Sequence, residues 1–90
     1  MPSYLVETYL ARGETGQRLA REQRARLAAE KLTHGRRRVS VMCSFNVPED
    51  EVCFFLVDAP SERDATLVAQ RAELDPIRVV EAISSGKEKR

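Results

Sequence analysis

The fold is decided by residues 39–57, which read VSVMCSFNVPEDEVCFFLV. The first half alternates between apolar and polar side chains, as a strand with one buried face does. Residues 48–51 (PEDE) form a turn, and residues 52–57 are almost wholly apolar, which is typical of a strand covered on both faces. The stretch therefore predicts a β-hairpin with three cross-strand pairs: Val47 with Val52, Phe45 with Phe54, and Cys43 with Leu56.

The flanking segments each predict one helix and one strand. Upstream, residues 4–10 are rich in β-branched and aromatic side chains, and a helix runs from an N-cap at Thr15 to about Thr33, before Gly35. Downstream, Ser61 caps a second helix that ends before Pro76, and residues 78–84 form the last strand.

The resulting order, β-α-β-β-α-β, is that of the ferredoxin-like split βαβ arrangement. We therefore predict an α+β fold with a four-stranded antiparallel sheet and two helices on one face. Right-handed connections place the first and third strands at the centre of the sheet. Residues 1–85 form this single domain, and residues 86–90 are a charged tail that we expect to be disordered.

Composition limits the classes of function. With 42% hydrophobic and 32% charged residues, the chain is typical of a soluble globular domain, and its net charge of +1 argues against nucleic-acid binding. No apolar run is long enough to span a membrane, and no signal peptide opens the sequence. Cys43 and Cys53 are too few for a disulfide framework. We expect a cytoplasmic protein.

The predicted hairpin assigns each residue to one face of the sheet. We expect its most apolar set to lie under the helices: Val39, Val41, Cys43, Phe45, Val47, Val52, Phe54 and Leu56. The opposite face then carries a set that is too apolar for water and too polar for a dry core: Ser40, Met42, Ser44, Asn46, Cys53, Phe55 and Val57. A second copy packed face to face would cover it and leave a mixed cavity, so we predict a homodimer.

Two carboxylates lie in the middle of predicted strands, where a charge must be paired or used. If Leu5, Glu7 and Tyr9 share the open face with Val79, Glu81 and Ile83, both carboxylates line the cavity as metal ligands or a general base. The alternatives are an ion pair with an arginine such as Arg78 and simple exposure at an edge. The predicted ligand-binding residues are Glu7, Tyr9, Ser44, Phe55 and Glu81.

Several segments resemble a family of small bacterial ferredoxin-like proteins of unknown function, some of which bind nickel. The most characteristic segment is residues 58–61 (DAPS), and further similarity lies in residues 4–7 (YLVE), 47–51 (VPEDE), 53–57 (CFFLV), 71–74 (RAEL) and 79–82 (VVEA). The resemblance implies a dimer and a divalent metal such as nickel. Many members have a histidine before the serine–aromatic pair of the second strand. Here the pair is Ser44-Phe45 and the preceding residue is Cys43, whose thiolate is our candidate metal ligand.

These patterns leave several functions open. We favour a dimer that binds a small ligand or metal over a non-enzymatic interaction module, which would have a dry, filled sheet face. A dimeric α/β-barrel-type enzyme would need a convergent acid–base pair, and the sequence offers Glu7 without a partner, so we assign no catalytic residue. RNA binding through the sheet would need a basic–Gly–aromatic motif on the third strand, which residues 49–57 lack.

Overall fold

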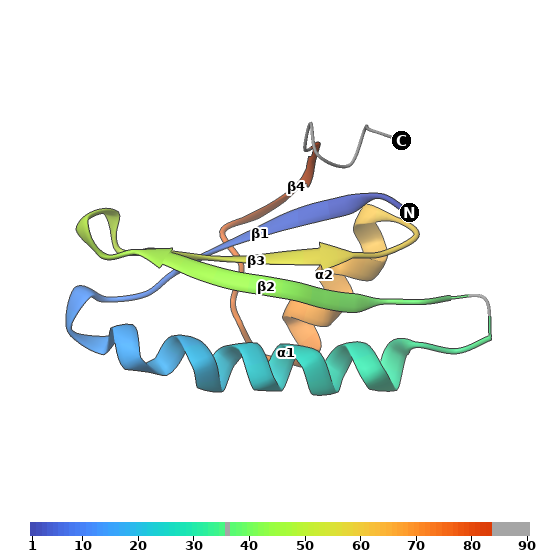
Figure 1. Ribbon diagram of the computed structural model, residues 1–90, viewed down its shortest axis with the longest axis horizontal. Helices are drawn as coiled ribbons and strands as arrows, with labels where there is room; N and C mark the ends of the chain where they lie inside the picture. Colours follow the sequence, from blue (N-terminus) through green and yellow to red (C-terminus); the bar gives the residue numbers. More distant parts are fainter. Residues whose placement is uncertain (36, 84–90) are drawn as a thin grey trace.

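The computed structural model describes residues 1–35 and 37–83, in the predicted β-α-β-β-α-β order (Figure 1). The strands are β1 (Ser3–Tyr9), β2 (Ser40–Val47), β3 (Val52–Asp58) and β4 (Arg78–Ala82). The helices are α1 (Arg18–Leu32) and α2 (Glu62–Arg71), with short 3₁₀ segments η1 (Arg12–Gln17) and η2 (Pro48–Asp50). The predicted domain end at residue 85 and the tail at 86–90 lie outside the described residues.

The four strands form one sheet in the order β2-β3-β1-β4, and all neighbouring strands are antiparallel. The first and third strands are central, as predicted. Helix α1 packs mainly against β2, whereas α2 packs against β1 and β4 (Figure 1). The chain therefore has the ferredoxin-like α+β fold. Among the described residues, no helix combines the length and the apolar character that crossing a bilayer requires.

The predicted register of the β2–β3 hairpin is confirmed. Val47 pairs with Val52, Phe45 with Phe54, and Cys43 with Leu56. Upstream of Cys43, the register shifts by one residue: Val41 pairs with Val57, so Met42 has no partner in the ladder and forms a β-bulge. Because side chains alternate between faces, this one extra residue places Val41 on one face and Cys43 on the other.

The predicted assignment of faces is wrong for most of the hairpin. Residues Cys53, Phe55 and Val57, which we expected on the open face, are at most 1% exposed and lie under the helices. They pair with the equally buried side of β1, opposite Thr8, Val6 and Tyr4, respectively. Residues expected in the core instead face away from the helices: Cys43, Phe45, Val47, Val52, Phe54 and Leu56.

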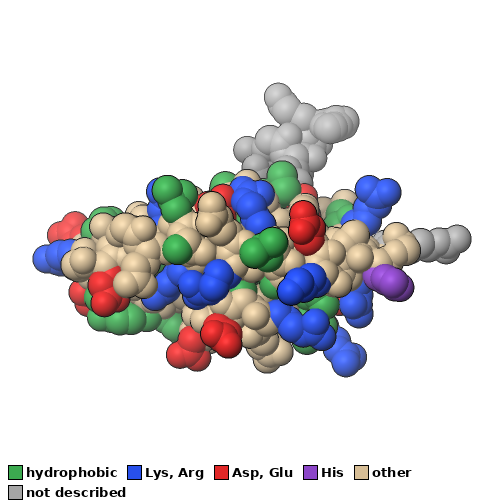
Figure 2. Space-filling model, turned by 90° about the horizontal axis from the view of Figure 1, so that it is seen from below, with side chains coloured by type: hydrophobic (Ala, Val, Ile, Leu, Met, Phe, Trp, Pro, Cys, Tyr) green, Lys and Arg blue, Asp and Glu red, His purple; other side chains and the backbone are tan. Residues whose placement is uncertain are grey.

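The core between the sheet and α1 is lined by small side chains. The buried residues of α1 are Ala25, Ala28, Ala29 and Leu32, and alanines let the helix approach the sheet closely. Two larger apolar residues of this helix, Leu19 and Leu27, are 61% and 58% exposed. Figure 2 views the molecule from the α1 side and shows Lys and Arg side chains interspersed with acidic ones on this surface.

The helix ends only partly follow the predicted capping. Ser61 caps α2 as predicted, because its hydroxyl accepts a hydrogen bond from the Asp64 N–H at 3.2 Å. Thr15, however, lies within η1, and α1 begins at Arg18 after Gln17, whose side chain makes no capping hydrogen bond. Gly35 adopts φ of +59° in the turn beyond the C-terminus of α1, a conformation that glycine adopts without strain.

Candidate functional site on the open face of the sheet

The face of the sheet away from the helices, which we call the open face, is arranged in four rows that cross the strands. The register defines the rows. Three consecutive rows are Val47–Val52–Tyr9, then Phe45–Phe54–Glu7–Arg78 as the middle row of the three, then Cys43–Leu56–Leu5–Val80. The fourth row, Ser40–Asp58–Ser3–Ala82, is mostly polar. An ion pair in the middle row is therefore flanked on both sides by apolar rows.

Two aromatic rings form the most prominent apolar feature of the open face. The rings of Phe45 and Phe54 stack with their centroids 5.2 Å apart and their planes at 30°. Phe45 is 45% exposed, and in the neighbouring row Tyr9 is 56% exposed and Val47 is 37% exposed. Apolar side chains of this size rarely gather on the surface of a monomer unless they contact a partner or a ligand.

Glu7 lies beside Phe54 in the middle row, and its charge is paired. Arg78 donates a hydrogen bond from Nε to Glu7 Oε1 at 3.1 Å. The Glu7 side chain is 24% exposed and that of Arg78 is 65% exposed, so the arginine covers the carboxylate from solvent. This is the ion pair that the sequence left open as an alternative. It does not exclude a binding role, because Arg78 contacts Glu7 through Nε while its side chain is 65% exposed, which leaves its terminal amino groups accessible to a ligand.

The other predicted ligand-binding residues are not all on this face. Tyr9 shares the open face with Glu7, as expected. Glu81 pairs with Tyr4, whose side chain is buried on the helix side, and it is exposed near the edge of the sheet. Phe55 is fully buried in the core. The proposed convergence of Glu7 and Glu81 in one cavity is therefore wrong.

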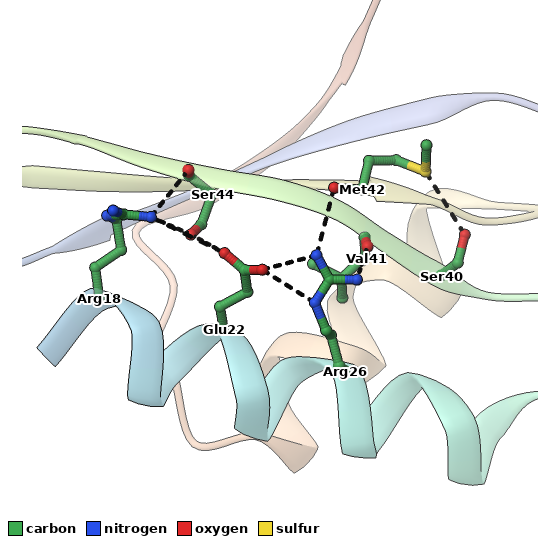
Figure 3. Close-up of polar contacts among 7 residues, drawn as sticks. All are labelled: Arg18, Glu22, Arg26, Ser40, Val41, Met42 and Ser44. Atoms are coloured by element: carbon green, nitrogen blue, oxygen red, sulfur yellow. Dashed lines mark hydrogen bonds and ion pairs between the residues drawn. The ribbon is translucent and has the colours of Figure 1, made fainter.

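Ser44 also faces the helices, where it joins a polar cluster that the sequence analysis did not identify (Figure 3). Its hydroxyl donates a hydrogen bond to Glu22 Oε1 and accepts one from Arg18 Nη1 at 3.1 Å. Glu22 Oε2 accepts two hydrogen bonds from Arg26, at 2.7 and 3.0 Å. The four-residue spacing of Arg18, Glu22 and Arg26 is the sequence signal that would have predicted ion pairs along one side of α1.

The Glu22 carboxylate is held in its charged form by this cluster. Its side chain is 16% exposed. The hydrogen bond from Ser44 lowers the pKa of Glu22 below its ordinary value of 4.5, and the hydrogen bonds and charge of Arg26 lower it further. Burial of the carboxylate raises its pKa, but the net shift of the Glu22 pKa is downward. Glu22 is therefore an anion under all near-neutral conditions.

The two cysteines occupy opposite faces of the sheet. Both are free, with Cys43 exposed on the open face and Cys53 buried under the helices, the reverse of the predicted assignment. Burial raises the pKa of the Cys53 thiol, which makes it a poor nucleophile and a poor metal ligand.

A nickel site is not formed within one chain by the residues that the structure describes. They contain no group of three or more His, Cys, Asp or Glu side chains that could hold a metal ion. Cys43 and Glu7 lie on strands separated by β3 and in different rows. Two strand spacings amount to about 10 Å between backbones. The two side chains therefore do not form a common set of ligands.

Comparison with known proteins supports the fold. A scan against protein-family models finds no match, and a search of curated proteins finds none either. Among solved structures, the chain is similar to SCO4226 from Streptomyces coelicolor A3(2), with a TM-score of 0.70 and 22% sequence identity. The match covers 92% of this chain and 98% of that chain. At this level of identity, the similarity shows a shared fold and nothing about metal binding. Nickel binding is therefore implied only by the family resemblance of the sequence.

Proposed function

We propose that the chain acts as a homodimer in which two open faces pack together and enclose a pocket for a small ligand. The observation that carries this proposal is the contiguous set of apolar side chains on the open face, with the Glu7–Arg78 ion pair in its middle row. A second copy removes the apolar rows from water, which is the main driving force for association of such surfaces.

The ion pair is what makes a pocket more plausible than a dry interface. A charged pair that is fully buried without further partners is costly, and filling the remaining hydrogen-bonding positions of Arg78 offsets that cost. A small ligand with an apolar body and an anionic group fits this arrangement. Its body would contact the Phe45 and Phe54 rings, while its anion would accept hydrogen bonds from the guanidinium.

A metal ion is the second occupant that the proposal covers. Cys43 is exposed on the same face, and a thiolate binds nickel, zinc or copper. The described residues of one chain contain no group of three or more side chains that could hold a metal ion. Cys43 therefore binds a metal only if the dimer brings a second ligand, from the other copy, beside it. A free thiol at this position also suits a reducing compartment such as the cytoplasm.

The small-ligand proposal can be tested with anilinonaphthalene sulfonate, which combines an aromatic body with one sulfonate. We expect saturable binding that is coupled to the dimer. Arg78→Gln should weaken binding about tenfold, because it removes a charge-assisted hydrogen bond. Arg71→Gln, in the last turn of α2, is the matched control and should leave binding unchanged. Equal affinity in the two variants would remove Arg78 from the site.

The metal branch is tested separately by titration calorimetry with nickel, zinc and copper, using wild type and Cys43→Ser. Binding heat that disappears in the variant assigns Cys43 as a ligand. Absence of binding heat with all three metals, together with unchanged thermal stability, would rule out the metal-binding proposal. The small-ligand pocket would still be decided by the fluorescent-ligand experiment.

A further inference from the structure

The outer edge of β2 carries an unusual set of hydrogen bonds. β2 is an edge strand, since β3 is its neighbour on one side and the sheet ends on the other. The backbone groups on the free side of an edge strand are a template for pairing with another strand. Helix α1 runs along this side of β2 (Figure 1).

Side chains of α1 and of the residue after it bond to the backbone of β2 and the residue before it. Arg18 Nη1 donates to the carbonyl of Ser44 at 3.3 Å. Arg26 donates to the carbonyls of Val41, at 2.7 Å, and of the bulge residue Met42, at 3.5 Å.

The same arrangement continues to the start of the strand. The Thr33 hydroxyl accepts the Val39 N–H at 3.1 Å and lies 3.1 Å from the Val39 carbonyl oxygen. Because α1 and β2 run in opposite directions, successive helix turns meet successive backbone positions of the strand. We call Arg18, Arg26 and Thr33 the edge row.

Glu22 fixes the two arginines of the edge row in this position. It lies one helical turn from each, accepts two hydrogen bonds from Arg26 and comes within 4.0 Å of Arg18 (Figure 3). It also accepts the hydroxyl hydrogen bond of Ser44, so the same carboxylate links α1 to the strand. Guanidinium groups that are held by a carboxylate lose less side-chain freedom when they bind carbonyls.

We propose that the edge row closes the outer edge of β2 to strand pairing, and that this edge is a latent surface for the β2 strand of a second copy. The partner is a second copy for the following reason. When two β2 strands pair antiparallel, the apolar side chains that each presents on its open face join into one continuous apolar surface. Cys43, Phe45 and Val47 then lie beside their counterparts. Covering the edge directs association to the open face.

The experiment compares two double variants of the full chain. Arg18→Ala with Arg26→Ala removes the guanidinium groups from the β2 backbone. Arg21→Ala with Arg24→Ala is the matched control, because these arginines of α1 donate to the carbonyls of Tyr9 and Ala72, outside β2. Both are examined by sedimentation velocity over a dilution series, with circular dichroism to confirm folding.

We expect the first variant to form species roughly twice the mass of the wild-type species or larger, and the control to match the wild type. Deuterium uptake of residues 39–47 should fall as the larger species form, because the outer amides of β2 become paired. If the folded variant keeps the wild-type mass and uptake, the proposal is overturned.

Two further variants keep the test decisive. If the double variant does not fold, Arg26→Ala alone is judged by the same two measurements, since Arg26 bonds two carbonyls of β2. The inference does not depend on the face-to-face dimer. In a Tyr9→Ala background, which weakens the open-face contact without altering β2, removal of Arg18 and Arg26 should still produce pairing through β2, so failure of one proposal is distinguishable from failure of the other.

Discussion

Replacement of Phe45 by alanine should weaken the proposed dimer strongly. A phenylalanine side chain contributes about 200 Å² of apolar surface. With 45% exposure, roughly 90 Å² per copy is available for burial against the partner. At about 25 cal/mol per Å², this is ~2 kcal/mol per copy and ~4 kcal/mol per dimer. The dimer dissociation constant should therefore rise roughly a thousandfold.

The assay is sedimentation velocity over a dilution series, with Leu27→Ala as the matched control. Leu27 is a comparably exposed apolar residue, at 58%, but it lies on α1 and not on the open face. Phe45→Ala also loses its ring contact with Phe54, worth about 1 kcal/mol of folding stability, so urea unfolding must show that the variant is folded under the assay conditions. A folded Phe45→Ala variant that dimerises as tightly as the Leu27→Ala variant would refute the reasoning.

Two further predictions concern the polar cluster and the cysteines. Glu22→Gln should lower the free energy of unfolding by about 1–3 kcal/mol at neutral pH. The folded-state pKa of Glu22 lies below its ordinary value of 4.5, so the wild-type advantage is complete above that pH and declines as the pH falls through the lowered folded-state value. Urea titrations of both proteins between neutral and acidic pH measure this difference, and an advantage that persists unchanged into strong acid would contradict it. Cys43 should react readily with a thiol reagent in the native monomer and more slowly as the dimer forms, whereas Cys53 should react only on unfolding. Mass spectrometry of labelled peptides distinguishes the two thiols, and rapid labelling of Cys53 in the folded protein would contradict its buried position.

The topology and the hairpin register could be predicted because they follow from local signals. The turn at residues 48–51 fixes the pairs on either side of it, and apolar strand patterns alternate with helix-forming segments along the chain. The assignment of faces could not be predicted in the same way. It depends on the bulge at Met42, where one unpaired residue reverses the alternation, and nothing in the residues around Met42 distinguishes a bulge from a regular strand.

The helix side of the structure shows a second limit of sequence reasoning. Large apolar residues usually indicate the buried side of a helix, but α1 buries Ala25 and Ala29 and exposes Leu19 and Leu27. Close packing against the sheet decided this orientation. The candidate site changed accordingly: Glu7 and Tyr9 remain on the open face, whereas Phe55 belongs to the core.

The most direct test of the account is the mass of the wild-type chain in solution, measured by light scattering on a size-exclusion column across a range of concentrations. We expect a species of twice the 10.2 kDa chain mass, because a second copy covers the open face. A mass of 10.2 kDa that persists at the highest concentrations would show that water alone can cover this face, and would contradict both the dimer and its pocket.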